Sequence, residues 1–150
     1  MKDSTEKDRT DLLCYDQLYA LGLEGRLDTD LDRLMLVEFK RLGQKKYKAG
    51  YTPMEQINKY LNKLKGKSIK TFDNKKIKIS EQCVFYCYII ADIEGELKTQ
   101  TSTWQKTANG RGRTNLLQGD FRGSVEIIEW NDLLQDAKLR NEAFISRLKV

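Results

Sequence analysis

Two oppositely charged residues interrupt an apolar stretch of the sequence, LMLVEFKRLG at residues 34–43. The composition predicts a core strand, and the apolar flanks predict that this strand is buried on both faces. Glu38 and Lys40 are two residues apart, so on a strand their side chains point to the same face. A buried charge costs free energy unless it is paired or binds a metal. The spacing therefore predicts one shared site with a further polar partner.

The aspartates closest to Glu38 in the sequence cannot supply that partner. Asp32 and Asp30 precede Glu38 by six and eight residues. On a straight strand this is a separation of roughly 20 to 26 Å, at about 3.3 Å per residue. The partner must therefore come from another strand.

Asp11 becomes the partner if residues 11–20 form a strand antiparallel to residues 31–40. Asp11 faces Glu38 when the numbers of paired residues sum to 49. This register places the turn inside the glycine-containing stretch 22–25, where a turn is expected independently. We therefore predict that Asp11 belongs to the site.

Asp11, Glu38 and Lys40 together suit metal-dependent hydrolysis of a phosphodiester. Two carboxylates at a strand end can hold Mg²⁺ or Mn²⁺, which prefer oxygen ligands. Such an ion lowers the pKa of a bound water, and a neighbouring lysine can orient the attacking hydroxide. The sequence contains no histidine, which excludes histidine-based serine or cysteine catalysis, histidine-ligated zinc and histidine-based nuclease mechanisms.

The composition indicates one globular domain over residues 1–150, with a polar leader at 1–9. Apolar residues make up 39% of the chain and charged residues 33%, and the net charge is +5. A chain of that length forms a single core. The mild excess of basic residues is only weak support for binding to nucleic acid. The three cysteines form no CxxC pair and are typical of reduced core residues. With no membrane span or signal peptide recognisable, we expect a cytoplasmic protein that does not bind a membrane.

The remaining pattern predicts an α/β protein of the α+β type, with a mixed central sheet flanked by helices. Thr52, followed by a proline and then a glutamate at the third helical position, predicts a helix that continues to about Lys65. The most apolar run, residues 83–93, predicts a central strand. The other expected elements are a basic loop at 41–51, a hairpin at 68–79 turning at Asp73-Asn74, a helix at 94–101, a basic loop at 105–123 with room for a strand in its second half, a closing strand at 124–130, and a last helix capped by Asn131 whose Leu133, Leu134, Ala137, Phe144 and Leu148 face the core.

Three motifs resemble the PD-(D/E)xK nuclease superfamily. Residues 9–13 (RTDLL) are similar to its PD strand with threonine in place of proline, residues 37–40 (VEFK) resemble its ExK strand, and residues 56–60 (QINKY) are similar to the QxxxY helix motif of the RecB-like branch. The resemblance implies a restriction-endonuclease-like core and a Mg²⁺-dependent nuclease. The roles that it implies are metal ligation by Asp11, Glu38 and the Phe39 carbonyl, catalysis by Lys40, and bracing of the site or substrate contact by Gln56 and Tyr60.

Four segments, in the same order along the chain, resemble the C-terminal nuclease-like domain of some bacterial proteins that carry a GHKL-type ATPase domain. They are residues 38–41, 55–60, 85–93 and 136–144. This resemblance implies a DNA substrate, an ATPase domain or subunit as partner and, by family association, defence against foreign DNA. Many superfamily members place another acidic residue on a helix before the first strand, whereas ten residues precede Asp11 here. The chain is therefore expected to be a piece of a longer protein or to use fewer ligands.

Two basic segments are suited to phosphate contacts. One contains Lys45, Lys46 and Lys48, and the other contains Arg111 and Arg113. A run of charges is more often a solvated surface, so it is the acidic site that gives a reason to favour contact with nucleic acid.

Other interpretations stay open at the level of the sequence. Glu38 and Lys40 could be a plain ion pair at a strand end, and Gln56 and Tyr60, which share a helix side, could be structural. The alternative function is a nuclease-like module that binds nucleic acid or a partner ATPase without cutting. Triplets with the same acidic-x-lysine spacing recur outside strands, so the strand context is what selects Glu38; they lie at residues 73–75, 96–98 and 136–138.

Overall fold

The computed structural model describes residues 12–15, 30–66 and 76–148, and for 12–15 it describes the backbone only. Several sequence predictions fall outside these residues. They are Asp11, the polar leader, the turn at 22–25 and the hairpin turn at Asp73-Asn74.

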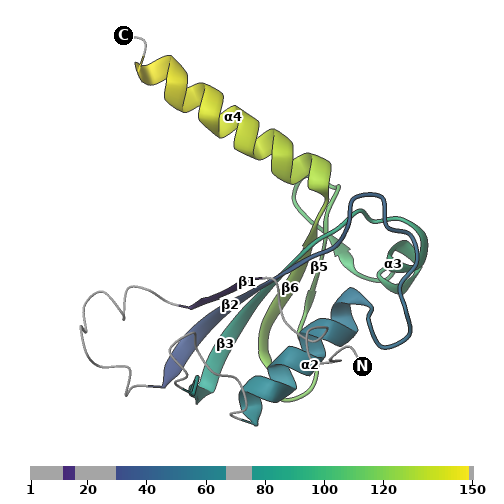
Figure 1. The fold of residues 1–150 in the computed structure, drawn as a ribbon, viewed down its shortest axis with the longest axis vertical. Coiled ribbons are helices and arrows are strands. Elements are labelled where there is room, and N and C mark those ends of the chain that lie inside the picture. Colours follow the sequence, from purple (N-terminus) through teal and green to yellow (C-terminus); the bar gives the residue numbers. More distant parts are fainter. Residues whose placement is uncertain (1–11, 16–29, 67–75, 149–150) are drawn as a thin grey trace, which may run out of the picture.

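The described residues form a mixed sheet of six strands in the order β1-β2-β3-β6-β5-β4 (Figure 1). The three central strands, β2, β3 and β6, are parallel, and the strands on either side of them are antiparallel to their neighbours. This arrangement confirms the predicted mixed sheet. The strand bounds are β1 Leu12–Tyr15, β2 Leu31–Phe39, β3 Ile79–Ile90, β4 Gln105–Lys106, β5 Arg113–Leu116 and β6 Arg122–Ile128.

Three helices lie within the residues that the structure describes: α2 Pro53–Lys65, α3 Gly95–Gln100 and α4 Trp130–Leu148. In Figure 1, α2 lies along one face of the sheet, whereas α4 leaves the sheet and extends away from it. The start of α2 has the predicted capping box, in which the Thr52 side chain accepts from the Glu55 N–H and the Glu55 side chain accepts from the Thr52 N–H. None of these helices is both long enough and apolar enough to span a membrane.

The pairing of β1 with β2 has the predicted register. Leu12 lies opposite Val37 and Tyr15 lies opposite Leu34, so the paired numbers sum to 49. A shift of one residue would turn every side chain of a strand to the other face. The register that the Asp11 hypothesis requires is therefore present in the neighbouring residues.

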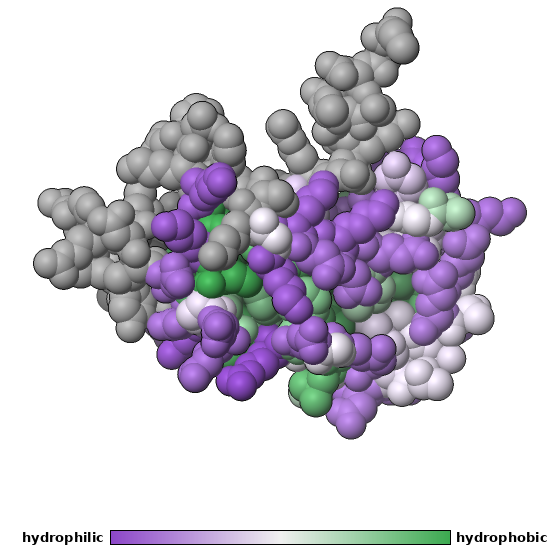
Figure 2. All heavy atoms as spheres, turned by 90° about the horizontal axis from the view of Figure 1, so that it is seen from below, coloured by the Kyte–Doolittle hydropathy of each residue, from purple (hydrophilic) through white to green (hydrophobic). Residues whose placement is uncertain are grey.

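The core lies between α2 and one face of the sheet. Leu36 of β2 and Cys87 of β3 are register partners, and both are buried beneath Ile57 and Leu61 of the helix. Cys83 is also buried, and neither it nor Cys87 is in a disulfide, as predicted. The view onto the α2 side shows mostly hydrophilic residues, with hydrophobic ones in small patches (Figure 2).

The other face of the sheet is only partly covered. Met35 of β2 and Tyr86 of β3 are register partners there, and each is 40% exposed. The prediction that this strand is buried on both faces therefore holds at Val37, which is 8% exposed, but not at Met35. An apolar composition indicates burial but does not show how many faces are covered.

Several predicted boundaries also differ. The segment 105–123 contains the strand predicted for its second half, β5, but its first half is not only a loop, because β4 pairs with β5 in a hairpin. Pairing of β5 with β6 joins this hairpin to the sheet. The strand at its end, predicted to close the sheet, instead lies between β3 and β5. The central strand predicted at 83–93 starts earlier and ends earlier, at Ile79–Ile90.

The last helix departs most from the sequence prediction. It begins at Trp130, so Asn131 lies inside its first turn and is not the cap. Leu134, Ala137, Phe144 and Leu148 are exposed and do not face the core. The apolar pattern identified a helix correctly, but the helix projects beyond the sheet that it was expected to cover.

Candidate functional site

The predicted charged pair lies at the carboxyl end of the parallel strands. Glu38 is the penultimate residue of β2, and Lys40 follows the strand end. The Lys40 Nζ lies 3.0 Å from Glu38 Oε1. Glu38 is only 3% exposed, so its charge is held in a site with little water, where an opposite charge has a strong effect. The prediction that both side chains share one face is confirmed.

Gln56 brings α2 into the same site. The Lys40 Nζ donates a hydrogen bond to Gln56 Oε1, so the ammonium group contacts both Glu38 and Gln56. Gln56 stands in the first turn of α2, where its N–H donates to the Thr52 carbonyl. Because the capping box fixes that turn, the helix start determines where Gln56 points.

The backbone of Lys40 is fixed from two sides. Its N–H donates to the Ile90 carbonyl of β3 at 2.9 Å, and its carbonyl accepts from Trp130 Nε1 at 2.7 Å. The Trp130 ring also lies 5.8 Å, centroid to centroid, from the Phe39 ring. Sequence reasoning missed Trp130. The only available signal was a tryptophan just after an apolar strand, which could not show that it reaches a residue 90 positions earlier.

Carboxylates at the same end of the sheet bind the loop that follows Lys40. Asp92 Oδ2 accepts from the Gly43 N–H at 2.6 Å, and Glu96 Oε2 accepts from the Tyr47 N–H at 3.0 Å. Burial, with the charges of Asp92 and Glu96, raises the pKa of the Tyr47 phenol above its usual value. These two carboxylates therefore hold the basic loop in place beside the site.

Gly95 is required by the same contact. Its φ of 56° is in the left-handed region, and a Cβ there would collide with the Lys45 carbonyl. That carbonyl accepts the Glu96 N–H at 2.9 Å. The start of α3 and the basic loop therefore pack backbone to backbone.

The three predicted lysines of this loop are exposed. Lys45 Nζ is 3.8 Å from Glu94 Oε2, and Lys48 Nζ lies 5.6 Å from the centre of the Tyr51 ring. Contacts of this kind at a surface are weak, so Lys45, Lys46 and Lys48 remain accessible to an anion.

The two predicted arginines make firmer contacts within the protein. Arg111 Nη1 lies 2.9 Å from Asp132 Oδ1, a carboxylate that is nearly buried at the start of α4. Arg113 Nη1 donates to the Lys98 carbonyl and to Thr101 Oγ1, both at 2.9 Å. Both guanidinium groups thus support the region around α3 and the root of α4.

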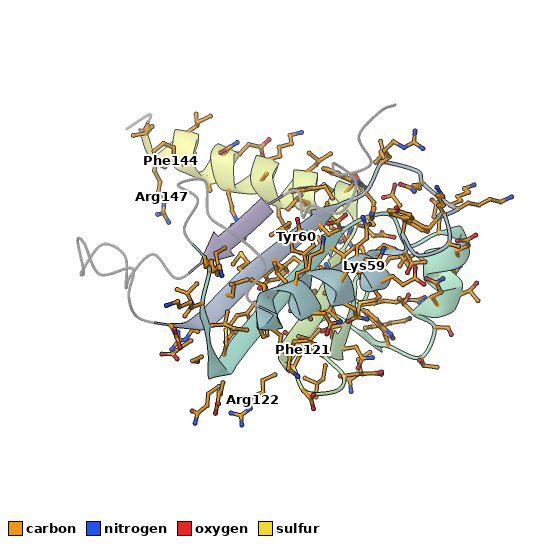
Figure 3. All side chains as sticks on the ribbon, turned by 60° about the horizontal axis from the view of Figure 1, so that its bottom comes forward. Lys59, Tyr60, Phe121, Arg122, Phe144 and Arg147 are labelled. Carbon is orange, nitrogen blue, oxygen red and sulfur yellow. The ribbon has the colours of Figure 1, made fainter. Side chains whose placement is uncertain are left out.

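Tyr60 lies in the hydrophobic core with Ile57 and Leu61 and is 8% exposed. Lys63 Nζ lies 5.8 Å from the centre of the Tyr60 ring. The helix therefore brings Gln56 to Lys40, while its next turn places Tyr60 in the core. Figure 3 labels Tyr60 on α2. Tyr60 therefore packs in the core. Its contact with a substrate stays a prediction.

The described part of the chain provides one of the two carboxylates that the predicted metal site requires. No three cysteine, aspartate or glutamate side chains in it gather closely enough to hold a metal ion. Glu38 is a buried oxygen donor beside the Phe39 carbonyl, which fits the hard cations predicted from the sequence. The second carboxylate in that hypothesis is Asp11, which lies outside the described residues.

Comparison with known proteins returned no match to a protein-family model, to a curated protein or to a solved structure. The resemblance to the PD-(D/E)xK superfamily therefore remains a hypothesis based on the motifs. What the geometry adds is a buried carboxylate, an enclosed ammonium group and an amide, brought together from β2 and α2.

Proposed function

We propose that this chain is a metal-dependent nuclease domain that hydrolyses phosphodiester bonds of nucleic acid, with DNA as its substrate. The observation that supports this most directly is the enclosed contact between Lys40 and Glu38 at the carboxyl end of the parallel strands. Open sheets that contain parallel strands tend to bind ligands outside that end. We also propose that the mixed sheet corresponds to a restriction-endonuclease-like core.

In this proposal Glu38 and Asp11 would hold Mg²⁺ or Mn²⁺, together with the Phe39 carbonyl. The ion, when bound, would lower the pKa of a water and offset charge on a phosphoryl oxygen. The β1–β2 register supports this assignment, because the pairing of Leu12 with Val37 is the one that the hypothesis requires.

Lys40 would contribute positive charge at the reacting phosphate. Its ammonium group is held by Glu38 and Gln56, and its backbone by Trp130 and Ile90. A group fixed in this way loses little freedom when a substrate binds, which is how preorganised charges stabilise a transition state. Lys45, Lys46 and Lys48 would contact the phosphates on either side.

The test is cleavage of plasmid DNA, single-stranded DNA and RNA in the presence of Mg²⁺ or Mn²⁺. Lys40→Ala and Glu38→Gln should each lower the rate by about a hundredfold or more, in the range found when a charge-stabilising group is removed. Lys98→Ala is the matched control, because Lys98 follows Glu96 with the same spacing but lies exposed on α3. Cleavage that is unchanged in both site variants would exclude this site.

The alternative is a module that binds nucleic acid or a partner ATPase without cutting. The observation that favours it is that the Lys40 ammonium group is already satisfied by Glu38 and Gln56, as in a structural ion pair. A metal titration separates the two functions. If Mn²⁺ neither raises the melting temperature nor supports cleavage, while DNA binds with a steep salt dependence, the binding module is the correct assignment.

A further inference from the structure

The exposed part of α4 carries an apolar stripe along one side. At about 100° per residue, six positions fall within one sector of the helix that is about 100° wide. We name them the α4 stripe: Leu134, Ala137, Asn141, Phe144, Ile145 and Leu148. The four large apolar members are 50% to 68% exposed. A helix with such a stripe normally covers it with a partner.

The part of the sheet and of the other helices that the structure describes does not cover the α4 stripe. In Figure 1 the helix starts at the sheet and runs outward, and Figure 3 shows Phe144 and Arg147 well apart from Lys59 and Tyr60 on α2. Every residue from Leu134 to Leu148 is exposed. The stripe is therefore accessible to a second molecule along its full length.

Four of the other five members of the α4 stripe are placed symmetrically about Asn141, and the exception is Phe144, whose counterpart position is Lys138. Leu134 lies seven residues before Asn141 and Leu148 seven residues after it, and Ala137 and Ile145 lie four residues on either side. If two copies of α4 lie antiparallel and cross at Asn141, Leu134 meets Leu148 and the small Ala137 meets the large Ile145. The Asn141 side chain can both donate and accept, so it can pair with its own copy. An asparagine in an apolar seam is a known device for fixing the pairing of two helices.

The charges along α4 favour the same antiparallel arrangement. The helix carries equal numbers of acidic and basic residues, so two copies do not repel: Asp132, Asp136 and Glu142 against Lys138, Arg140 and Arg147. Lys138 and Glu142 flank the stripe and lie 3.9 Å apart within one helix. Across an antiparallel pair, Lys138 of one copy lies near Glu142 of the other. In a parallel pair the two edges that carry Lys138 and Glu142 would lie on opposite sides of the seam, so this pairing between copies would be lost.

We propose that α4 is a dimerisation helix, which pairs antiparallel with the α4 of a second copy of this chain through the α4 stripe. Only one helix from each copy takes part, and the contact is smaller than the roughly 800 Å² per partner of a typical stable interface. The expected dimer is therefore concentration-dependent, with a Kd on the order of micromolar. The proposal does not depend on the nuclease assignment.

Sedimentation velocity of the whole chain over a range of concentrations tests the association. We expect a monomer–dimer equilibrium, with a Kd that rises about tenfold or more in Ile145→Lys, because a charge would enter the apolar seam. Leu139→Lys is the matched control, since Leu139 is 62% exposed on the side of α4 away from the stripe. Both substitutions are at exposed positions and should leave the melting temperature of the monomer unchanged.

A cysteine cross-link tests the register. Under mild oxidation Asn141→Cys should form a disulfide-linked dimer, whereas Leu139→Cys and the parent chain, which controls for the native cysteines, should not. Three results would overturn the proposal. They are a monomer at the highest attainable concentration, a dimer with the same Kd in Ile145→Lys, or a dimer that Asn141→Cys links no better than Leu139→Cys does.

Discussion

Helices α2 and α4 have the same kind of sequence pattern and opposite surroundings. Both are amphipathic, and the last helix was predicted to face the core. The apolar side of α2 is completely buried at three positions: Ile57, Leu61 and Leu64. The large side chains of the α4 stripe are at least half exposed. Amphipathicity therefore indicates that a helix face needs cover without indicating which surface provides it.

Chain connectivity explains the difference. Helix α2 lies between β2 and β3, two parallel neighbours, and a crossover between such strands must return across the face of the sheet. Helix α4 follows β6, and no strand described after it brings the chain back. Its contact with the body is concentrated in its first turn, where Trp130 and Asp132 meet Lys40 and Arg111.

The largest difference in the free energy of unfolding between the two helices should appear when one leucine is truncated in each of them. Leu61→Ala removes a completely buried side chain from under α2 and should lower the free energy of unfolding by about 2–5 kcal/mol. Leu134→Ala removes an exposed one and should change it by less than about 0.5 kcal/mol. Urea unfolding at a concentration where the chain is monomeric measures both. Equal losses would show that α4 is covered within the monomer.

The thiols under α2 should make stability fall at high pH. Burial raises the pKa of Cys87 to about 12, and burial together with the Asp32 charge raises that of Cys83 to about 11, from a usual value of 9.0. Above pH 9 the unfolded chain loses these protons before the folded chain does. The stabilisation is therefore complete below about pH 9 and declines as the pH rises, by up to about 1.4 kcal/mol per pH unit for each thiol.

Unfolding measured between pH 8 and pH 10 would show this slope. A Cys83→Ala/Cys87→Ala variant should have a shallower slope than the parent chain, whatever its absolute stability. An Ile145→Lys variant on α4 should keep the parent slope. If the double variant also keeps it, the thiols are not protected by the cover that α2 provides.

The first turn of α4 should contribute less to the free energy of unfolding than the core under α2 does. Trp130→Phe keeps a ring near Phe39 but removes the hydrogen bond to the Lys40 carbonyl, and we expect a loss of about 1–2 kcal/mol. Trp104→Phe, at a tryptophan packed against the core, measures the effect of shrinking the ring alone. Thermal unfolding should show a larger shift for Trp130→Phe. The opposite order would mean that α4 is anchored elsewhere.

The smallest effect should come from the helix starts. Thr52→Ala breaks the capping box of α2 and should cost about 1 kcal/mol. Asn131→Ala should change stability by only a few tenths, because Asn131 is inside the first turn of α4 and not its cap. Chemical unfolding of the two variants side by side compares them. A loss at Asn131 as large as that at Thr52 would contradict the boundary assigned to α4.

Local patterns allowed a good part of the site to be predicted. Alternation along a strand put Glu38 and Lys40 on one face. Placing Asp11 opposite Glu38, with support from the turn expected at 22–25, gave the β1–β2 register in which paired residue numbers sum to 49. The capping box gave the start of α2 and so the place of Gln56. Each of these depends on residues that are close in sequence or on one hairpin, where geometry leaves few choices.

The sequence by itself therefore determined that Glu38 and Lys40 share a face, in which register β1 and β2 pair, and which helices are amphipathic. The tertiary structure alone decided that Trp130 reaches the Lys40 carbonyl, that the polar segment 105–116 forms a hairpin, and that the α4 stripe stays exposed. These features depend on strand order, and strand order is set by the free energy of packing the whole sheet. An apolar pattern reports only that burial is favourable, and many arrangements of the same elements can satisfy it.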